Sequence, residues 1–216
     1  MMRTLYGYFR SSAAYRARIA LNLKGLDYER AYVHLTRNGG EQFAAEFRAL
    51  NPQSLVPVLL DGDVTLTQSI AIIEYLDEVY PTPPFLPKDP AARARVRSLA
   101  LHIACEIHPL NNLRVLRYLS NDLKVSEGQK NEWYRHWIVT GLAPLESRLA
   151  NDPATGKFCH GDSPGLADIC LIPQLANARR FEIDLAPYPT LTRIETNCMA
   201  LPAFQHAAPS AQPDAE

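Results

Sequence analysis

Long apolar runs are missing from this sequence of 216 residues. No stretch approaches the roughly 20 consecutive apolar residues that a helix needs to cross a bilayer. The first residues contain too few apolar side chains, and are interrupted too soon by Arg10, to form a secretory signal peptide. We therefore expect a cytoplasmic protein without a membrane partner.

An excess of positive charge is also missing. The chain has 22 Lys and Arg against 23 Asp and Glu, which gives a formal net charge of -1. Binding to a nucleic-acid backbone depends on clustered cations. This balance therefore argues against a nucleic-acid partner.

Cysteine is scarce, with only four in the chain. None belongs to a Cys-x-x-Cys pair, and no His and Cys residues stand at the spacing of zinc ligands. We expect reduced, mostly buried thiols and no metal. The residues concerned are Cys105, Cys159, Cys170 and Cys198.

Strand and helix patterns alternate in the first eighty residues. Strands are expected over 4–8, 28–35, 56–60 and 64–67, and helices over 12–24, about 41–50 and 70–79. Asp61-Gly62-Asp63 is typical of a hairpin turn. The predicted order is β-α-β-α-β-β-α, and a right-handed crossover makes the first two strands parallel.

A proline-rich segment separates this part from a purely helical one. Five prolines fall within residues 81–90, which we interpret as a semi-rigid linker between a domain at 1–80 and one at 91–216. Apolar residues then recur at helical spacing over 96–110, over 138–149 and from Leu171 onward. The last ten or so residues look like a loosely held tail.

The segment from Arg10 to Arg16 lies where the first strand gives way to a helix. Amides of a first helical turn have no partners within the helix, and the helix dipole favours an anion such as a thiolate there. The Ser11 hydroxyl could add a hydrogen bond to it. The alternative is that Ser11 or Ser12 only caps the helix.

Two further motifs lie at similar junctions. If the Val56-Pro57 bond were cis, the backbone of Val56 could bind a peptide-like ligand as an added strand would; the alternative is a trans proline at the start of an edge strand. Gln68 and Ser69 open a helix directly after a strand, where Ser69 could hold a carboxylate or act only as a cap.

In this order the motifs resemble the zeta class of glutathione transferases, the maleylacetoacetate and maleylpyruvate isomerases, over nearly the whole chain. The resemblance implies a thioredoxin-like α/β domain followed by an all-α domain, glutathione as coenzyme and a homodimer. The residues that carry it include 8–12, 16–21, 50–52, 56–57, 68–76, 80–83, 107–112, 166–168 and 173–181.

The resemblance also implies the role of individual residues. Ser11 matches the serine that stabilises the glutathione thiolate, and Ser12 lies beside it. Pro57 is expected to be cis. The remaining glutathione contacts that it implies are Gln42, Val56, Gln68, Ser69, His108 and Asn112.

Two residues depart from the family pattern. Ala13 stands where the family commonly has Cys, so the thiol chemistry must come from glutathione itself. Gly165 stands where a Ser or Thr usually caps the helix that contains Asp168. Because Gly is an acceptable N-cap, half of a capping box survives.

The implied reaction turns a maleyl group into a fumaryl group by thiolate addition, bond rotation and elimination. Because the substrates are dicarboxylates, fixed cations are expected near them. Arg10 is the leading candidate for catalysis and substrate binding, with Arg114 and Arg180 as further substrate contacts. A solvated surface role is the alternative for each arginine.

Other functions fit the same resemblance. The protein could be a glutathione transferase or dehalogenase acting on α-haloacids, or a glutathione-binding protein without catalysis. Ala13 argues against a glutathione-dependent reductase. For His102, on the helical stripe, packing is a better interpretation than catalysis.

Overall fold

The computed structural model describes residues 2–216, which form two compact units. One comprises the residues up to Phe85 together with Met199–Glu216, and the other comprises Leu86–Cys198. The division at Phe85 falls inside the segment expected to be a linker.

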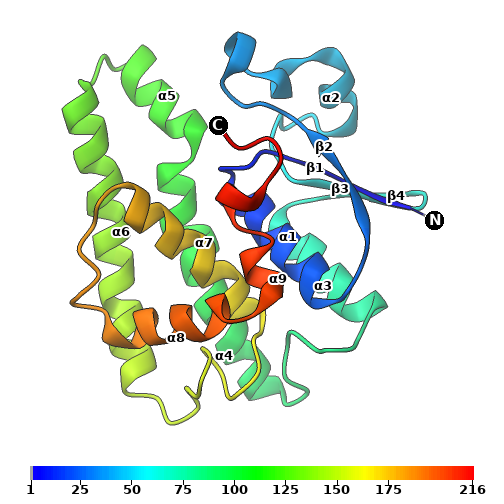
Figure 1. Ribbon diagram of the computed structural model, residues 1–216. Coiled ribbons are helices and arrows are strands. Elements are labelled where there is room, and N and C mark those ends of the chain that lie inside the picture. The colour runs from blue at the N-terminus through cyan, green and yellow to red at the C-terminus, as the bar shows by residue number, and fades with distance from the viewer. Residues whose placement is uncertain (1) are drawn as a thin grey trace. The chain divides into compact units, whose positions relative to one another are not determined.

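A four-stranded sheet organises the described part of the first unit (Figure 1). Its strands are β1 (Arg3–Gly7), β2 (Tyr28–Tyr32), β3 (Val58–Asp61) and β4 (Val64–Thr67), in the order β2-β1-β3-β4. Strands β1 and β2 are parallel, as predicted, while β3 runs antiparallel to both β1 and β4. Gly62, with a φ of 61°, makes the turn between β3 and β4.

The helices of this unit are α1 (Ser12–Leu23), α2 (Ala45–Leu50), α3 (Ser69–Val79) and the short α9 (Pro202–Gln205). Helix α1 ends at the predicted place, because Gly25 adopts a φ of 65° directly after its C-cap Lys24. The helix expected over 41–50 is divided: Ala44 is extended and separates η2 (Glu41–Phe43) from α2. The remaining short helices are η1 (Arg37–Gly39) and η5 (Pro209–Ala211).

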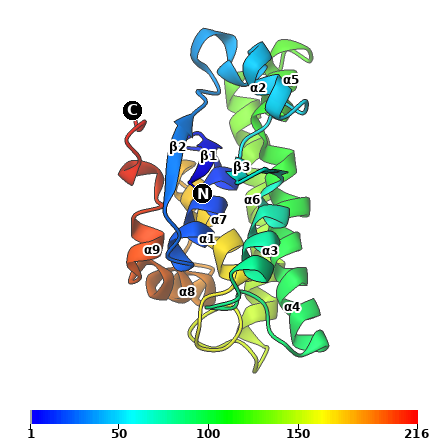
Figure 2. The same cartoon turned by 90° about the vertical axis from the view of Figure 1, so that its right-hand side faces the viewer.

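Helix α1 is the centre of this unit. Ile19, Ala20 and Leu21 have no exposed surface, and Ile72 and Leu76 of α3 are equally buried. Helices α1 and α3 lie side by side in both views of the molecule (Figures 1 and 2). This packing fixes the first turns of both helices relative to the sheet.

The C-terminal segment is not the loose tail that its composition predicted. Phe204 and Ala207 are fully buried, and Asn22 on α1 donates a hydrogen bond to the carbonyl of Ala203 at 3.0 Å. Gln212 is 5% exposed and donates to the carbonyls of His206 and Ala208. A few apolar side chains that fit against α1 thus outweigh a composition rich in Ala, Pro and Gln.

The regular elements described in the second unit are all helices (Figure 2). Its α-helices are α4 (Pro90–Leu101), α5 (Leu113–Asn121), α6 (Glu127–Ala150), α7 (Leu166–Arg180) and α8 (Pro189–Met199), the last of which reaches the boundary between the units. None of the described helices is long and apolar enough to cross a membrane.

The apolar stripe over 96–110 is not one uniform helix. After α4 the backbone becomes the π-helical η3 (His102–Ile107) and then the 3₁₀ segment η4 (His108–Asn111), with Pro109 at its start. Next to this change, Gly141 of α6 lies so near Ile107 that a Cβ there would be 2.3 Å from its Cδ1. A ring nitrogen of His102 lies 2.8 Å from the carbonyl of Gly141, which supports the packing role expected for His102.

The predicted half of a capping box is present at α7. Gly165 is the N-cap, and the Asp168 carboxylate accepts hydrogen bonds from the amides of Gly165 and Cys159 at 2.9 and 2.8 Å. Burial raises the pKa of Asp168, although both amides oppose the rise. None of the four cysteines forms a disulfide, and three of them are buried.

Candidate functional site

Ser11 is the N-cap of α1. Its Oγ accepts a hydrogen bond from the amide of Ala14 at 3.2 Å, and its own amide donates to the carbonyl of Tyr8 at 3.0 Å. A serine hydroxyl has one hydrogen to donate besides its lone pairs, so the cap leaves the O–H available to an anion. The capping and the thiolate interpretations of Ser11 are therefore compatible.

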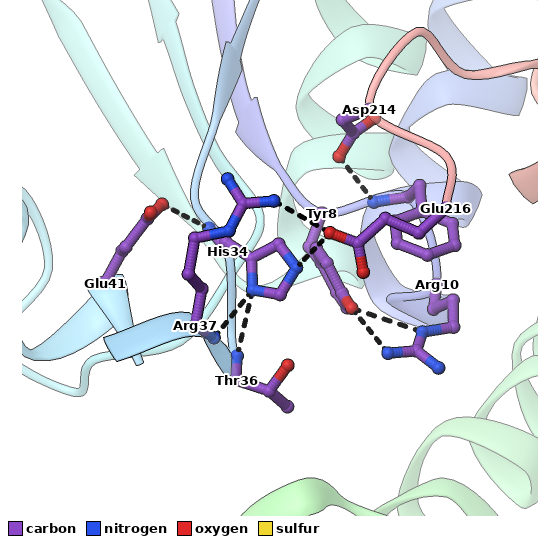
Figure 3. Close-up of polar contacts among 9 residues, drawn as sticks. Tyr8, Arg10, His34, Thr36, Arg37, Glu41, Asp214 and Glu216 are labelled. Atoms are coloured by element: carbon purple, nitrogen blue, oxygen red, sulfur yellow. Dashed lines mark hydrogen bonds and ion pairs between the residues drawn. The ribbon is translucent and has the colours of Figure 1, made fainter. Parts of the chain in front are cut away.

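Arg10 precedes this cap and is exposed. Its guanidinium donates to the hydroxyl of Tyr8 from Nη2 at 2.7 Å and from Nε at 3.2 Å, as Figure 3 shows. The guanidinium also lies 5.1 Å from the centre of the Phe9 ring. Two aromatic neighbours in sequence thus orient the cation beside the start of α1.

The loop before β3 contains the cis bond that the resemblance implied, between Val56 and Pro57. Both residues are buried. Asn51 holds the loop together: its side chain donates to the carbonyl of Leu55 at 2.8 Å and accepts from the amide of Gln53 at 3.1 Å. The sequence motif contained Asn51, but no role was assigned to it.

Gln68 and Ser69 stand at the start of α3. Gln68 is the N-cap and has a φ of 68°. This conformation is energetically costly for a residue other than Gly, and residues that adopt it are frequent at functional sites. Its side chain donates to Oε1 of Gln53 at 2.9 Å. Ser69 is 6% exposed, and Nη1 of the buried Arg16 lies 3.5 Å from its Oγ.

Gln42, in η2, has a buried polar atom without a partner. Its Nε2 donates to the carbonyl of Leu35 at 3.3 Å, but Oε1 accepts no hydrogen bond from any residue in 2–216. Gly40 makes this geometry possible, since a Cβ at that position would lie 2.6 Å from Oε1. An unsatisfied buried acceptor indicates a place where a donor from a ligand or water is expected.

The first unit thus presents its predicted residues at the ends of regular elements. Ser11 and Ser12 begin α1, Val56 and Pro57 precede β3, and Gln68 and Ser69 open α3. Helix starts provide unpaired amides and partial positive charge, so the arrangement favours an anionic, peptide-like ligand.

In the second unit, three of the predicted residues follow one another along the chain. His108 opens η4, and Asn112 is the N-cap of α5, where its Oδ1 accepts from the amide of Arg114 at 3.1 Å. The side chain of Arg114 is exposed in the first turn of α5.

Arg180, the last residue of α7, is held by an aromatic pair. Its Nη2 donates to the hydroxyl of Tyr134 at 3.1 Å and lies 3.4 Å from Oδ1 of Asn177. The rings of Tyr134 and Phe181 stack with centres 3.6 Å apart, and burial raises the pKa of the Tyr134 hydroxyl. Tyr134 was not predicted from sequence.

Family models decide what kind of protein carries these residues. The model described as "Glutathione S-transferase, N-terminal domain" matches residues 1–78, and the one described as "Glutathione S-transferase, C-terminal domain" matches residues 132–204. The chain belongs to the glutathione S-transferase family.

Three similar proteins indicate the class within this family to which the chain belongs. It is 55% identical over 215 residues to a Vibrio cholerae protein named probable maleylacetoacetate isomerase, covering 100% of this chain and 99% of that one. A solved holo structure of a maleylpyruvate isomerase, described as a bacterial zeta-class glutathione S-transferase, matches with a TM-score of 0.95 and 48% identity over 99% of this chain and 100% of that one. A maleylacetoacetate isomerase from Methylobacterium extorquens AM1, solved with malonate and GSH, also has a TM-score of 0.95, at 46% identity over 99% of each chain. The predicted zeta-class membership is confirmed.

Ala13 lies in the first turn of α1, so this transferase has no cysteine at that turn. Three of its cysteines are buried, and the exposed one, Cys105, lies in η3 of the other unit. No group of three or more His, Cys, Asp or Glu side chains suited to a metal occurs within residues 2–216. The polar side chains at the predicted site positions of the first unit are hydroxyls, amides and the Arg10 guanidinium.

Proposed function

We propose that this glutathione S-transferase is a glutathione-dependent cis–trans isomerase that converts a maleyl dicarboxylate, maleylpyruvate or maleylacetoacetate, into its fumaryl isomer. The observation that carries the proposal is the pairing of a thiolate-stabilising group with a fixed cation. The Ser11 hydroxyl caps the start of α1, and the guanidinium of Arg10, the preceding residue in the sequence, is held by the Tyr8 hydroxyl. The names of the relatives supply the substrate class.

The residues of the first unit fit glutathione along its length. The unpartnered Oε1 of Gln42 can accept a hydrogen bond near the glycine end. The backbone of Val56 suits the cysteinyl unit, and the start of α3 with Gln68 and Ser69 suits the γ-glutamyl carboxylate. We assign His108 and Asn112 of the second unit as further contacts, on the resemblance alone.

Glutathione supplies a thiolate that adds to the conjugated cis double bond, permits rotation about the resulting single bond and is then eliminated unchanged. Ser11 and the first-turn amides of α1 favour the ionised thiol. A free thiol with a pKa of about 8.5 is only ~3% ionised at pH 7, whereas a pKa two units lower makes it roughly three-quarters ionised. The donors at the start of α1 are the groups that can supply this shift.

The arginines bind the two carboxylates of the substrate. Addition to the double bond places further negative charge on the substrate, so a preorganised cation stabilises the transition state more than the ground state. We assign Arg10 to this role and Arg180 and Arg114 to carboxylate binding. Tyr134 holds Arg180 in place, as Tyr8 holds Arg10.

The test is the rate of loss of maleylpyruvate and of maleylacetoacetate, with and without glutathione. Turnover should require glutathione, and Ser11→Ala should lower kcat by about a hundredfold because one preorganised donor is lost. Ser210→Ala, an exposed serine in the same unit, is the matched control and should leave kcat unchanged. Arg114→Ala should raise KM for the preferred substrate.

Either of two results would contradict the proposal. Turnover that does not depend on glutathione would remove the coenzyme from the mechanism. Turnover of an α-haloacid together with inactivity on both maleyl substrates would make the protein a conjugating or dehalogenating transferase instead.

We also propose a cytoplasmic homodimer. Four cysteines without a disulfide among them agree with a reducing compartment. The homodimer rests on the resemblance to the zeta class. Light scattering that gives only the monomer mass of 24.2 kDa would contradict the dimer.

A further inference from the structure

The C-terminal segment, residues 199–216, contacts the turn of residues 8–11 that precedes α1. The amide of Phe9 donates to Oδ2 of Asp214 at 3.0 Å, a bond drawn in Figure 3. The carbonyl of the same residue accepts from Nη2 of Arg18 at 3.0 Å. Both backbone groups of Phe9, the residue before Arg10, are therefore held by side chains.

Arg18 joins the turn to the C-terminal segment. Its Nε donates to the carbonyl of Ala207 at 2.9 Å, and its Nη1 donates to the carbonyl of Tyr8 at 3.4 Å. The residue is only 4% exposed, and a charged group at such depth is costly unless it is hydrogen-bonded. Burial lowers the pKa of Arg18 to about 10, so the guanidinium stays protonated at neutral pH and keeps its donors.

Tyr8 and Phe9 in turn determine where Arg10 lies. The Tyr8 hydroxyl accepts two hydrogen bonds from the Arg10 guanidinium, and the rings of Tyr8 and Phe9 lie beneath it. The two rings meet edge to face, with centres 4.7 Å apart. A shift of the Phe9 backbone would therefore move the surface on which Arg10 rests.

We propose that Asp214 and Arg18 are positioning residues that fix Tyr8 and Phe9 so that Arg10 meets a carboxylate of the substrate. Neither residue touches the substrate. The proposal rests on the proposed function for the role of Arg10, and it makes the C-terminal segment part of the active-site architecture.

The same segment has a second anchor that serves as a control. Glu216 bonds to Nε2 of His34 at 3.1 Å and to Nη2 of Arg37 at 2.8 Å (Figure 3). Nδ1 of His34 accepts from the amides of Thr36 and Arg37, so Nε2 carries the hydrogen that it donates to Glu216. The Glu216 side chain is 51% exposed. Its removal should break its bonds to His34 and Arg37 but leave the bond between the Phe9 amide and Asp214 in place.

The experiment compares Asp214→Ala, Asp214→Asn and Glu216→Ala in the full-length chain with bound glutathione. The Asn side chain keeps an acceptor for the Phe9 amide, whereas Ala removes it. Asp214→Ala should weaken binding of malonate, a non-reacting dicarboxylate, and lower kcat/KM by about tenfold, because small displacements of a positioned group are costly. Asp214→Asn should stay within about threefold of wild type, and Glu216→Ala within about twofold. Arg18→Lys, which cannot reach the carbonyls of Tyr8 and Phe9 together, should behave like Asp214→Ala.

A double-mutant cycle separates positioning from general destabilisation. In an Arg10→Ala background, Asp214→Ala should cost little further malonate affinity, while its effect on the melting temperature should persist. Any one of three results would overturn the proposal. Asp214→Ala could lower malonate affinity equally with and without Arg10, Asp214→Ala and Glu216→Ala could have equal effects, or the wild type could fail to bind malonate. If wild type binds malonate but turns over no maleyl substrate, the proposed function fails while the positioning proposal is still decided by the binding data.

Discussion

Arg10 and Arg180 are held in the same chemical way in two very different settings. Each guanidinium donates to a tyrosine hydroxyl and lies over aromatic rings. Arg10 bonds to Tyr8, two positions away in sequence, whereas Arg180 bonds to Tyr134, 46 positions away on another helix. The first pair forms within one turn of chain, and the second requires the packing of α6 and α7.

The two arginines also differ in the helix dipole that acts on their positive charge. Arg180 ends α7, where the helix dipole favours a cation, while Arg10 precedes the start of α1, where the dipole disfavours one. Positive charge at the start of α1 is useful because a thiolate is expected there. It follows that Arg10 needs more external support than Arg180, and it has that support in Tyr8, Phe9 and the residues that hold them.

The largest effects should come from removing each guanidinium. Arg10→Ala and Arg180→Ala should each lower kcat/KM by about a hundredfold, since a charged hydrogen-bond partner of a carboxylate is lost. Only Arg10→Ala should also raise the pKa of the bound glutathione thiol, measured by ultraviolet titration, because it removes a positive charge beside Ser11.

Arg179→Ala is the control for this pair. Arg179 neighbours Arg180 on α7 but forms an ion pair with Glu195, so its loss should leave turnover nearly unchanged. If Arg10→Ala and Arg180→Ala changed the thiol pKa equally, Arg10 would have no special influence on the thiolate expected at the start of α1.

The tyrosine hydroxyls should have smaller and unequal effects. Tyr8→Phe removes the acceptor of two hydrogen bonds from Arg10, whereas Tyr134→Phe leaves Arg180 near Asn177 and over the Phe181 ring. We expect kcat/KM to fall about tenfold for Tyr8→Phe and about threefold for Tyr134→Phe. A larger loss for Tyr134→Phe would mean that the distant tyrosine does more than hold its arginine.

The same contrast between near and distant partners explains how much could be predicted. The strand and helix order and the parallel β1–β2 pair were predicted correctly, and the cap at Ser11 was one of two interpretations left open. Local sequence did not determine the isomer of the Val56-Pro57 bond, which is cis in the fold. The role of Ser11 as thiolate donor and the ligand contacts of Gln42, Gln68 and Ser69 stay predictions.

Partners far apart in the chain could not be predicted. Asp214 meets Phe9 across 205 positions, and the segment that contains Asp214 has the composition of a tail. Tyr134 belongs to α6, for which the sequence pattern predicted only an apolar, buried stripe. The long helical stripe changes after Leu101 beside the close approach of Gly141 to Ile107, which periodicity alone does not reveal.

The smallest effect is expected at Gly165, at the opposite end of α7 from Arg180. Helix α1 begins with a side-chain cap at Ser11, whereas α7 relies on Asp168 alone. The φ of -136° and ψ of -165° at Gly165 suit any residue, so Gly165→Ser can add the missing cap without strain. Thermal unfolding should show a gain of about 0.5 kcal/mol, with kcat unchanged because Arg180 lies at the far end of the helix. A loss of stability instead would show that the bare backbone at Gly165 is needed for close packing, and that the two helices begin differently for steric reasons.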